Sequence, residues 1–157
     1  MTAPDAVPDP VMARIAEGQE RATAGDPAGA AAVFAEVWEQ IGGDAGDPLH
    51  VVSLAHFMAD VQDDPVEELR WDQRALAAVD GLTDERAQRY HATLAVRGFL
   101  PSLHLNLAAD HQRLGDRAAA LGHLDRAEAA VSALHDDGYG AMIRGGVARL
   151  RAELGPG

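Results

Sequence analysis

The chain has 157 residues, of which 47% are hydrophobic and only 4% aromatic; it is rich in alanine, which favours close-packed helices over a β-sheet. Its formal charge of −12 argues against nucleic acid and membrane surfaces as partners, because phosphate groups would repel it. The lack of cysteine excludes disulfides and thiol catalysis, and no apolar run approaches the roughly 18 residues of a membrane span.

The first ten residues contain proline and aspartate but no positive charge and no apolar run. We therefore expect residues 1–10 to be a disordered N-terminal tail rather than a signal peptide, and the protein to be cytoplasmic. Residues 11–154 are expected to form a single domain. Residues 1–80 contain 16 acidic and 4 basic residues. A partner attracted by charge would therefore be basic.

Three aspartates mark helix starts along this domain. Asp26, Asp64 and Asp116 stand where the side chain of an N-cap residue accepts the first free backbone N–H groups. Pro27 and Pro65 follow at the first helical position, which tolerates proline. Each of these signals follows an earlier apolar-periodic segment, so the pattern predicts three helical hairpins. We place the hairpins at residues 11–41, 49–79 and 101–131.

The third hairpin carries a repeat-like pattern of small and large apolar residues around a Gly/Asp turn. The residues of the pattern are Leu107, Ala108, Gly115, Asp116, Ala120, Leu124 and Ala127. This pattern resembles the tetratricopeptide repeat (TPR) family. Residues 50–76, 101–110 and 138–140 also resemble uncharacterised repeat proteins of actinobacteria. The resemblance implies an all-α fold, a TPR-like right-handed stack of helical hairpins.

The spacing of the repeats departs from that family. The marker aspartates are 38 and 52 positions apart, against about 34 in a TPR. The longer interval is large enough for one inserted helix, which we expect to begin at Thr83 and to run to about Arg97. Residues 139–154 are expected to form a C-terminal helix that caps the stack.

The resemblance implies a concave groove lined by the first helices of the hairpins, which would hold a peptide or a partner helix. The lining residues would be Met12, Ile15, Gln19, Ser53, Phe57, Asp60, Leu105, Ala109 and Arg113. The first hypothesis is therefore a non-enzymatic protein- or peptide-binding module, whose partner is an amphipathic or basic segment. Self-association into a homo-oligomer stays open.

A second hypothesis rests on polar residues at positions where the repeat family usually has apolar ones. The candidates are His56, Asp60, Glu68, Asp72, His104 and Asp110. Helical bundles build metal sites from such inward-facing side chains, and these ligand types suit a divalent metal such as zinc, manganese or iron. The resemblance also implies that His56 contacts Glu68 across the second hairpin. His104 and His111, seven residues apart, should share one helix face.

The same cluster has two other interpretations. It could be an internal hydrogen-bond network that orders the packing, or an acid/base or polar ligand pocket of a small enzyme. No glycine-rich phosphate loop, nucleophile elbow or His-Glu-x-x-His motif is present, so the sequence assigns no catalytic residue and argues against an enzyme without excluding one. We expect His123 and His135 to face solvent.

Overall fold

The computed structural model describes residues 8–91 and 95–155. Over these ranges all of the regular secondary structure is helical, and there is no β-strand. The α-helices are α1 (Pro10–Thr23), α2 (Pro27–Ile41), α3 (Pro48–Asp60), α4 (Pro65–Val79), α5 (Asp84–Tyr90), α6 (Leu100–Arg113), α7 (Arg117–Ala130) and α8 (Gly138–Leu154). Three short 3-10 helices join them: η1 (Gly43–Ala45), η2 (Val96–Phe99) and η3 (Val131–Ala133). The all-α prediction is confirmed. Among the described helices, none has the length and apolar character needed to cross a membrane.

Aspartate side chains begin most of these helices. Asp26, Asp64 and Asp116 each accept a hydrogen bond from a backbone N–H two or three residues further on, at 2.9–3.1 Å, as the sequence predicted. Sequence reasoning missed three further caps of the same kind, at Asp9, Asp47 and Asp137. Each cap satisfies one of the backbone donors that a helix start leaves without an intrahelical partner.

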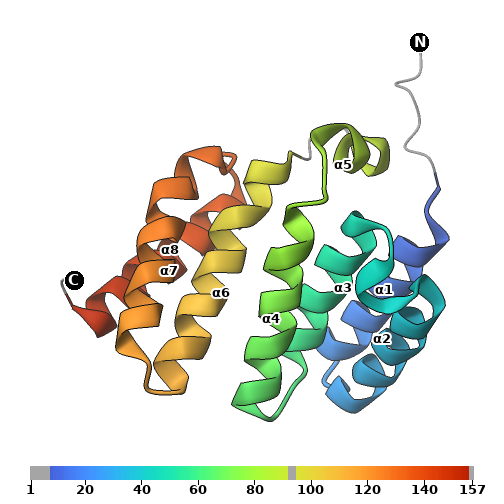
Figure 1. The fold of residues 1–157 in the computed structure, drawn as a ribbon, viewed down its shortest axis with the longest axis horizontal. Coiled ribbons are helices and arrows are strands. Elements are labelled where there is room, and N and C mark those ends of the chain that lie inside the picture. Colours follow the sequence, from blue (N-terminus) through green and yellow to red (C-terminus); the bar gives the residue numbers. More distant parts are fainter. Residues whose placement is uncertain (1–7, 92–94, 156–157) are drawn as a thin grey trace.

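The helices pack in sequence-adjacent pairs, α1 with α2, α3 with α4, and α6 with α7. The pairs stand side by side in a row, and α8 closes the row beside α6 and α7 (Figure 1). Three hairpins and a C-terminal closing helix are therefore present, as predicted. Ala30, Ala75 and Ala120 are fully buried, so small side chains stand where paired helices approach each other closely.

The segment between the second and third hairpins differs from the prediction. Thr83 caps α5 as expected, but α5 ends at Tyr90 instead of continuing to about Arg97. The Asp84 carboxylate accepts a hydrogen bond from the backbone N–H of Val96 at 2.7 Å. In one continuous helix these two residues would lie about 18 Å apart, so the chain must turn back after α5. Residues 92–94 of the expected helix lie outside the described residues.

The start of the chain is also ordered earlier than we expected. Residues 1–7 of the expected tail lie outside the described residues. Asp9 and Pro10, which we had placed in that tail, form the N-cap and the first residue of α1. The Asp9 carboxylate accepts the backbone N–H of Met12 at 3.0 Å, and this bond fixes the start of the helix.

Buried apolar side chains form two separate clusters. The first belongs to α1–α5 and the connections between them, and reaches α6 at Leu103. The second joins α6, α7 and α8 around Leu124 and Val147. Between the two, α4 packs against α6, and the aspartates Asp72 and Asp110 of this contact are each only 2% exposed. The two apolar cores therefore meet at a seam that contains buried carboxyl groups.

Candidate binding groove and carboxylate cluster

An apolar groove of about 470 Å³ is lined by residues of α1, α3, α5 and η2. Met12, Ile15 and Gln19 line it from α1, and Ser53 and Phe57 line it from α3. Their spacing of three or four residues places each set on one face of its helix. These five residues belong to the predicted lining, and the structure brings them together around one groove.

The groove has further walls that sequence reasoning missed. Tyr90 of α5 and Phe99 of η2 contribute aromatic side chains, and Leu49 contributes from the start of α3. The aromatic side chains of Tyr90 and Phe99 were the available sequence signal for a groove wall. The position of Phe99, however, depends on the turn after α5. The inserted segment therefore forms part of the groove wall.

The other predicted lining residues lie elsewhere. Leu105 and Ala109 of α6 pack against the second apolar core, and Leu105 lies close to the backbone of Gly146 in α8. Arg113 is ion-paired with Glu68, and Asp60 stands exposed at the end of α3, outside the groove lining. The predicted groove does not continue onto α6, because α8 covers this face of the helix.

Polar groups at the groove are few. The side-chain oxygen Oε1 of Gln19 is buried and has no hydrogen-bond partner in the described ranges. A buried acceptor without a donor costs about 1–3 kcal/mol. Glu20 adds an exposed carboxylate at the edge of the same groove. The groove therefore offers an apolar surface, one acceptor in need of a donor, and one negative charge.

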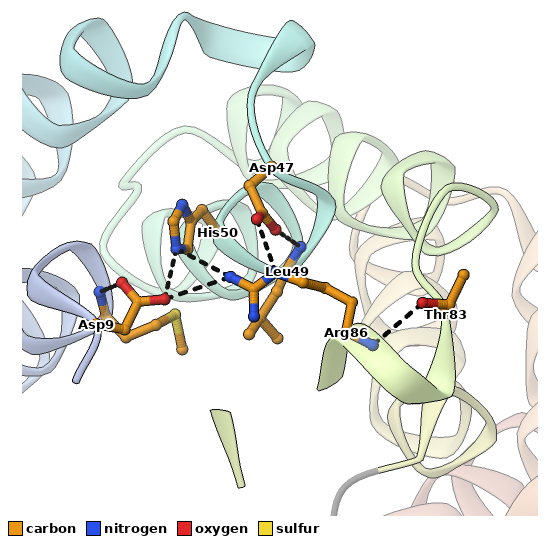
Figure 2. Close-up of polar contacts among 7 residues, drawn as sticks. Asp9, Asp47, Leu49, His50, Thr83 and Arg86 are labelled. Atoms are coloured by element: carbon orange, nitrogen blue, oxygen red, sulfur yellow. Dashed lines mark hydrogen bonds and ion pairs between the residues drawn. The ribbon is translucent and has the colours of Figure 1, made fainter. Parts of the chain in front are cut away.

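An ion-pair network, shown in Figure 2, lies at the starts of α1 and α3, and we call it the Asp9 network: Asp9, Asp47, His50 and Arg86. Asp9 Oδ2 lies 2.8 Å from His50 Nε2 and 3.3 Å from Arg86 Nη2. Arg86 Nε donates to Asp47 Oδ2 at 2.7 Å. The network thus connects the starts of α1 and α3 to α5.

The electrostatics of this network favour its charged form. Burial would raise the pKa of Asp9, but hydrogen bonds from His50 and from the backbone of Met12 outweigh it and hold the pKa below the usual value. Asp47 shows the same balance, with Arg86 as the main opposing partner that lowers its pKa. Both carboxylates therefore stay ionised near neutral pH and keep the positive charge of Arg86 on α5 in place.

A second polar site lies at the seam between α4 and α6. Glu68 and Asp72, four residues apart on α4, face Asp110 of α6, and one oxygen from each of the three lies within 4.8 Å of the others. We call these three residues the carboxylate cluster. Burial raises the pKa of Asp72 to about 7; the charges of Asp60 and Glu68 act in the same direction, whereas hydrogen bonds with Asp110 and Asn106 oppose it. Burial raises the pKa of Asp110 to about 11, and Asp72 and Glu68 act in the same direction.

The groups around this cluster differ from the predicted contacts. His56 does not pair with Glu68; its Nδ1 lies 3.1 Å from the amide nitrogen of Asn106, which reaches it from α6. Glu68 instead accepts a hydrogen bond from Arg113 at 3.0 Å. Burial lowers the pKa of His56, although the nearby Asp60 carboxylate opposes this effect. His56 is therefore a neutral neighbour of the cluster.

His104, which we had expected among the metal ligands, lies apart from these carboxylates. Its Nδ1 is 3.1 Å from Nδ1 of His123 on α7, and the two rings stack with centroids 5.4 Å apart. His111 stacks on His123 at the same centroid distance. His104 and His111 therefore share a face, as predicted, but it is turned toward α7.

We call His104, His111 and His123 the histidine stack. His123 does not simply face solvent, as we had expected, whereas His135 is exposed. Burial, together with the neighbouring His104, His111 and Arg126, lowers the pKa of His123 to about 4. The short Nδ1–Nδ1 distance requires one ring to donate and the other to accept, so the accepting imidazole is neutral in the folded protein.

Of the six predicted metal ligands, the structure brings together Glu68, Asp72 and Asp110, while His56 and Asp60 lie beside them. Comparison with protein-family models, curated proteins and solved structures gives no match for this chain. The assignment of a function therefore depends on the geometry of the groove and of the carboxylate cluster.

Proposed function

We propose that the protein is a non-enzymatic binding module, built as a TPR-like stack, that holds a short peptide segment in the groove between α1 and α3. The observation that carries this proposal is the groove itself. Its volume of about 470 Å³ falls in the range of ligand pockets, roughly 300–1,000 Å³. Its main walls are the first helices of two hairpins, which is where a TPR-like stack presents its concave surface.

The chemistry of the groove defines the partner as a segment with apolar side chains and a basic flank. The apolar walls favour burial of side chains such as leucine or phenylalanine. Gln19 Oε1, which lacks a donor in the described structure, would accept a hydrogen bond from an N–H group of the partner. Glu20 lies at the edge, and the excess of acidic residues in the first half of the chain would attract a basic segment.

A pair of matched variants on α1 tests the groove. Ala13 and Ala16 are both exposed, but only Ala16 lines the groove. Short random peptides displayed on phage would be selected on the wild-type protein, and the selected peptides synthesised for titration calorimetry. Ala16→Trp should fill the groove and weaken binding at least about tenfold, a loss of 1.4 kcal/mol. Ala13→Trp should bind as the wild type does.

A second pair tests the charge of the partner. Glu20→Arg and Glu39→Arg change the net charge equally, but only Glu20 lies at the groove. Binding of the selected peptides should weaken with Glu20→Arg and stay nearly constant with Glu39→Arg. The proposal is wrong if Ala16→Trp binds every selected peptide as tightly as the wild type, or if selection on the folded protein yields no specific peptide.

A further inference from the structure

We propose that the carboxylate cluster at the seam between α4 and α6 is a binding site for one hard divalent cation, of the class of Mg²⁺, Ca²⁺ and Mn²⁺. The ligands are Glu68, Asp72 and Asp110. The site is separate from the peptide groove, which is lined by α1, α3, α5 and η2.

The first observation is the spacing of the oxygens. One carboxylate oxygen from each residue lies within 4.8 Å of the other two. Ligands of one such cation, each at about 2.0–2.6 Å from it, are separated by no more than twice that distance. The positions of Glu68 and Asp72, one helical turn apart, turn both side chains toward the same face of α4. Asp110 completes the set from the facing helix.

The second observation is a pair of buried oxygens that lack partners. Asp72 Oδ1 and Asp110 Oδ2 have no hydrogen-bond partner anywhere in the described residues, although both side chains are only 2% exposed. A carboxyl oxygen removed from water is costly to leave without a partner. Coordination of a cation by these oxygens would remove that cost. Asp72 also has hydrogen-bond contacts with Asp110 and Asn106.

The charge balance supports a divalent ion. The three carboxylates, when ionised, bring three negative charges to the seam. Arg113, bonded to Glu68 at 3.0 Å, is the positively charged side chain that contacts them in the described part of the chain. His56 stays neutral because burial lowers its pKa. Two carboxylate charges of the cluster then remain, which one divalent cation neutralises, and the nearby Asp60 adds negative potential at Asp72.

The ligand chemistry selects the class of ion. All three ligands are carboxylates, which suit hard cations such as Mg²⁺, Ca²⁺ and Mn²⁺. The imidazoles that would favour zinc are bound elsewhere: His104 contacts His123, and His56 contacts Asn106. Glu68 and Arg113 both keep contact with solvent, so the ion can enter past this pair.

Manganese is the probe for the test. The full chain, freed of metal with a chelator, would be titrated with Mn²⁺ and followed by electron paramagnetic resonance, which detects the free ion. We expect one bound Mn²⁺ per chain, displaced by Ca²⁺ or Mg²⁺. Asp110→Asn and Asp72→Asn keep the shape of the side chain and should weaken binding at least about tenfold. Asp80→Asn removes an equal charge at the exposed C-terminal end of α4, outside the cluster, and should bind within about twofold of the wild type.

The outcomes separate a cation from a shared proton. If folded wild-type protein binds no Mn²⁺, or if Asp110→Asn binds it as tightly as the wild type, the proposal is refuted and the aspartates share a proton instead. Circular dichroism establishes that each variant is folded. Should Asp110→Asn fail to fold, Glu68→Gln at the solvent side of the cluster provides the same comparison and must also weaken Mn²⁺ binding.

Discussion

Acidification should destabilise the protein through the histidine stack between α6 and α7. The pKa of His123 is lowered to about 4 in the folded protein, from the usual histidine value of 6.5. Between these two pH values the unfolded chain binds a proton that the folded protein excludes. The stabilisation is therefore complete above about pH 6.5 and is lost as the pH falls toward 4. The pKa of His104 is shifted in the same direction by burial and Arg126.

The size of the effect follows from the two pKa values. Lowering the pH from 7 to 4.5 costs about 2.4 kcal/mol for a group that titrates at about 4 when folded and at 6.5 when unfolded. The ring of His123 is only half-buried, so screening by water reduces this to about 1–2 kcal/mol. The titratable and charged groups near it are His104, His111 and Arg126. Asp116 lies next to His111, with its Oδ2 4.0 Å from His111 Nδ1.

The assay is urea unfolding followed by circular dichroism, at several pH values between 7 and 4.5. His123→Gln keeps a polar side chain beside His104 but cannot take up a proton. Wild type should lose about 1–2 kcal/mol more free energy of unfolding over this range than His123→Gln does. His135→Gln, at an exposed site, should follow the wild type.

The comparison between variants removes the opposite effect of the buried aspartates. The raised pKa values of Asp72 and Asp110 make the protein more stable on acidification, but they do so in both wild type and variant. Only the difference between the two proteins reports on the histidine stack. Equal pH dependence for wild type and His123→Gln would show that the histidine stack does not exclude a proton on folding, and would refute the predicted loss of stability at low pH.

Two further predictions concern stability at neutral pH, measured by urea unfolding. Asp9→Ala removes both a helix cap and the anchor of the Asp9 network, so it should cost about 2–3 kcal/mol, whereas Asp26→Ala removes an exposed cap and should cost about 1 kcal/mol. Equal losses would show that the network contributes nothing. Gly18→Ala would drive a methyl group into the buried ring of Phe34 and should cost about 1–3 kcal/mol. The methyl group of Gly122→Ala would point into open space on α7, so this variant should stabilise the helix by roughly 0.5–1 kcal/mol. A similar loss of stability for Gly18→Ala and Gly122→Ala would contradict the close contact between Gly18 and Phe34.

The sequence predicted the features that depend on local chemistry. Helix starts at Asp26, Asp64 and Asp116 could be found because an N-cap is specified by the cap residue and the few that follow it. The buried alanines Ala30 and Ala75 could be placed because helical periodicity fixes which residues share a face. Both kinds of signal act within a single hairpin, which is why the pairing of helices could be predicted.

The features that depend on contacts between hairpins could not be derived in this way. Phe99 reaches the groove because the chain turns back after α5, and the turned-back segment is joined to α5 by a bond across twelve positions, from Asp84 to Val96. The predicted contact of His56 with Glu68 was wrong for a related reason. Asn106 belongs to the next hairpin, and its position depends on how α6 packs on α4, which no local pattern in the sequence specifies.

The polar seam between α4 and α6 has a consequence for how the protein unfolds. Helical stacks gain their cooperativity from apolar contacts between neighbouring hairpins. Here the main apolar clusters lie on either side of the seam, and the carboxyl groups between them are stabilised only when a proton or a cation neutralises them. The C-terminal hairpin with α8 can then open as a unit of its own while α1 to α4 stay folded. We therefore expect unfolding in one step when a proton or a cation neutralises the three carboxyl groups, and in two steps when they are all ionised.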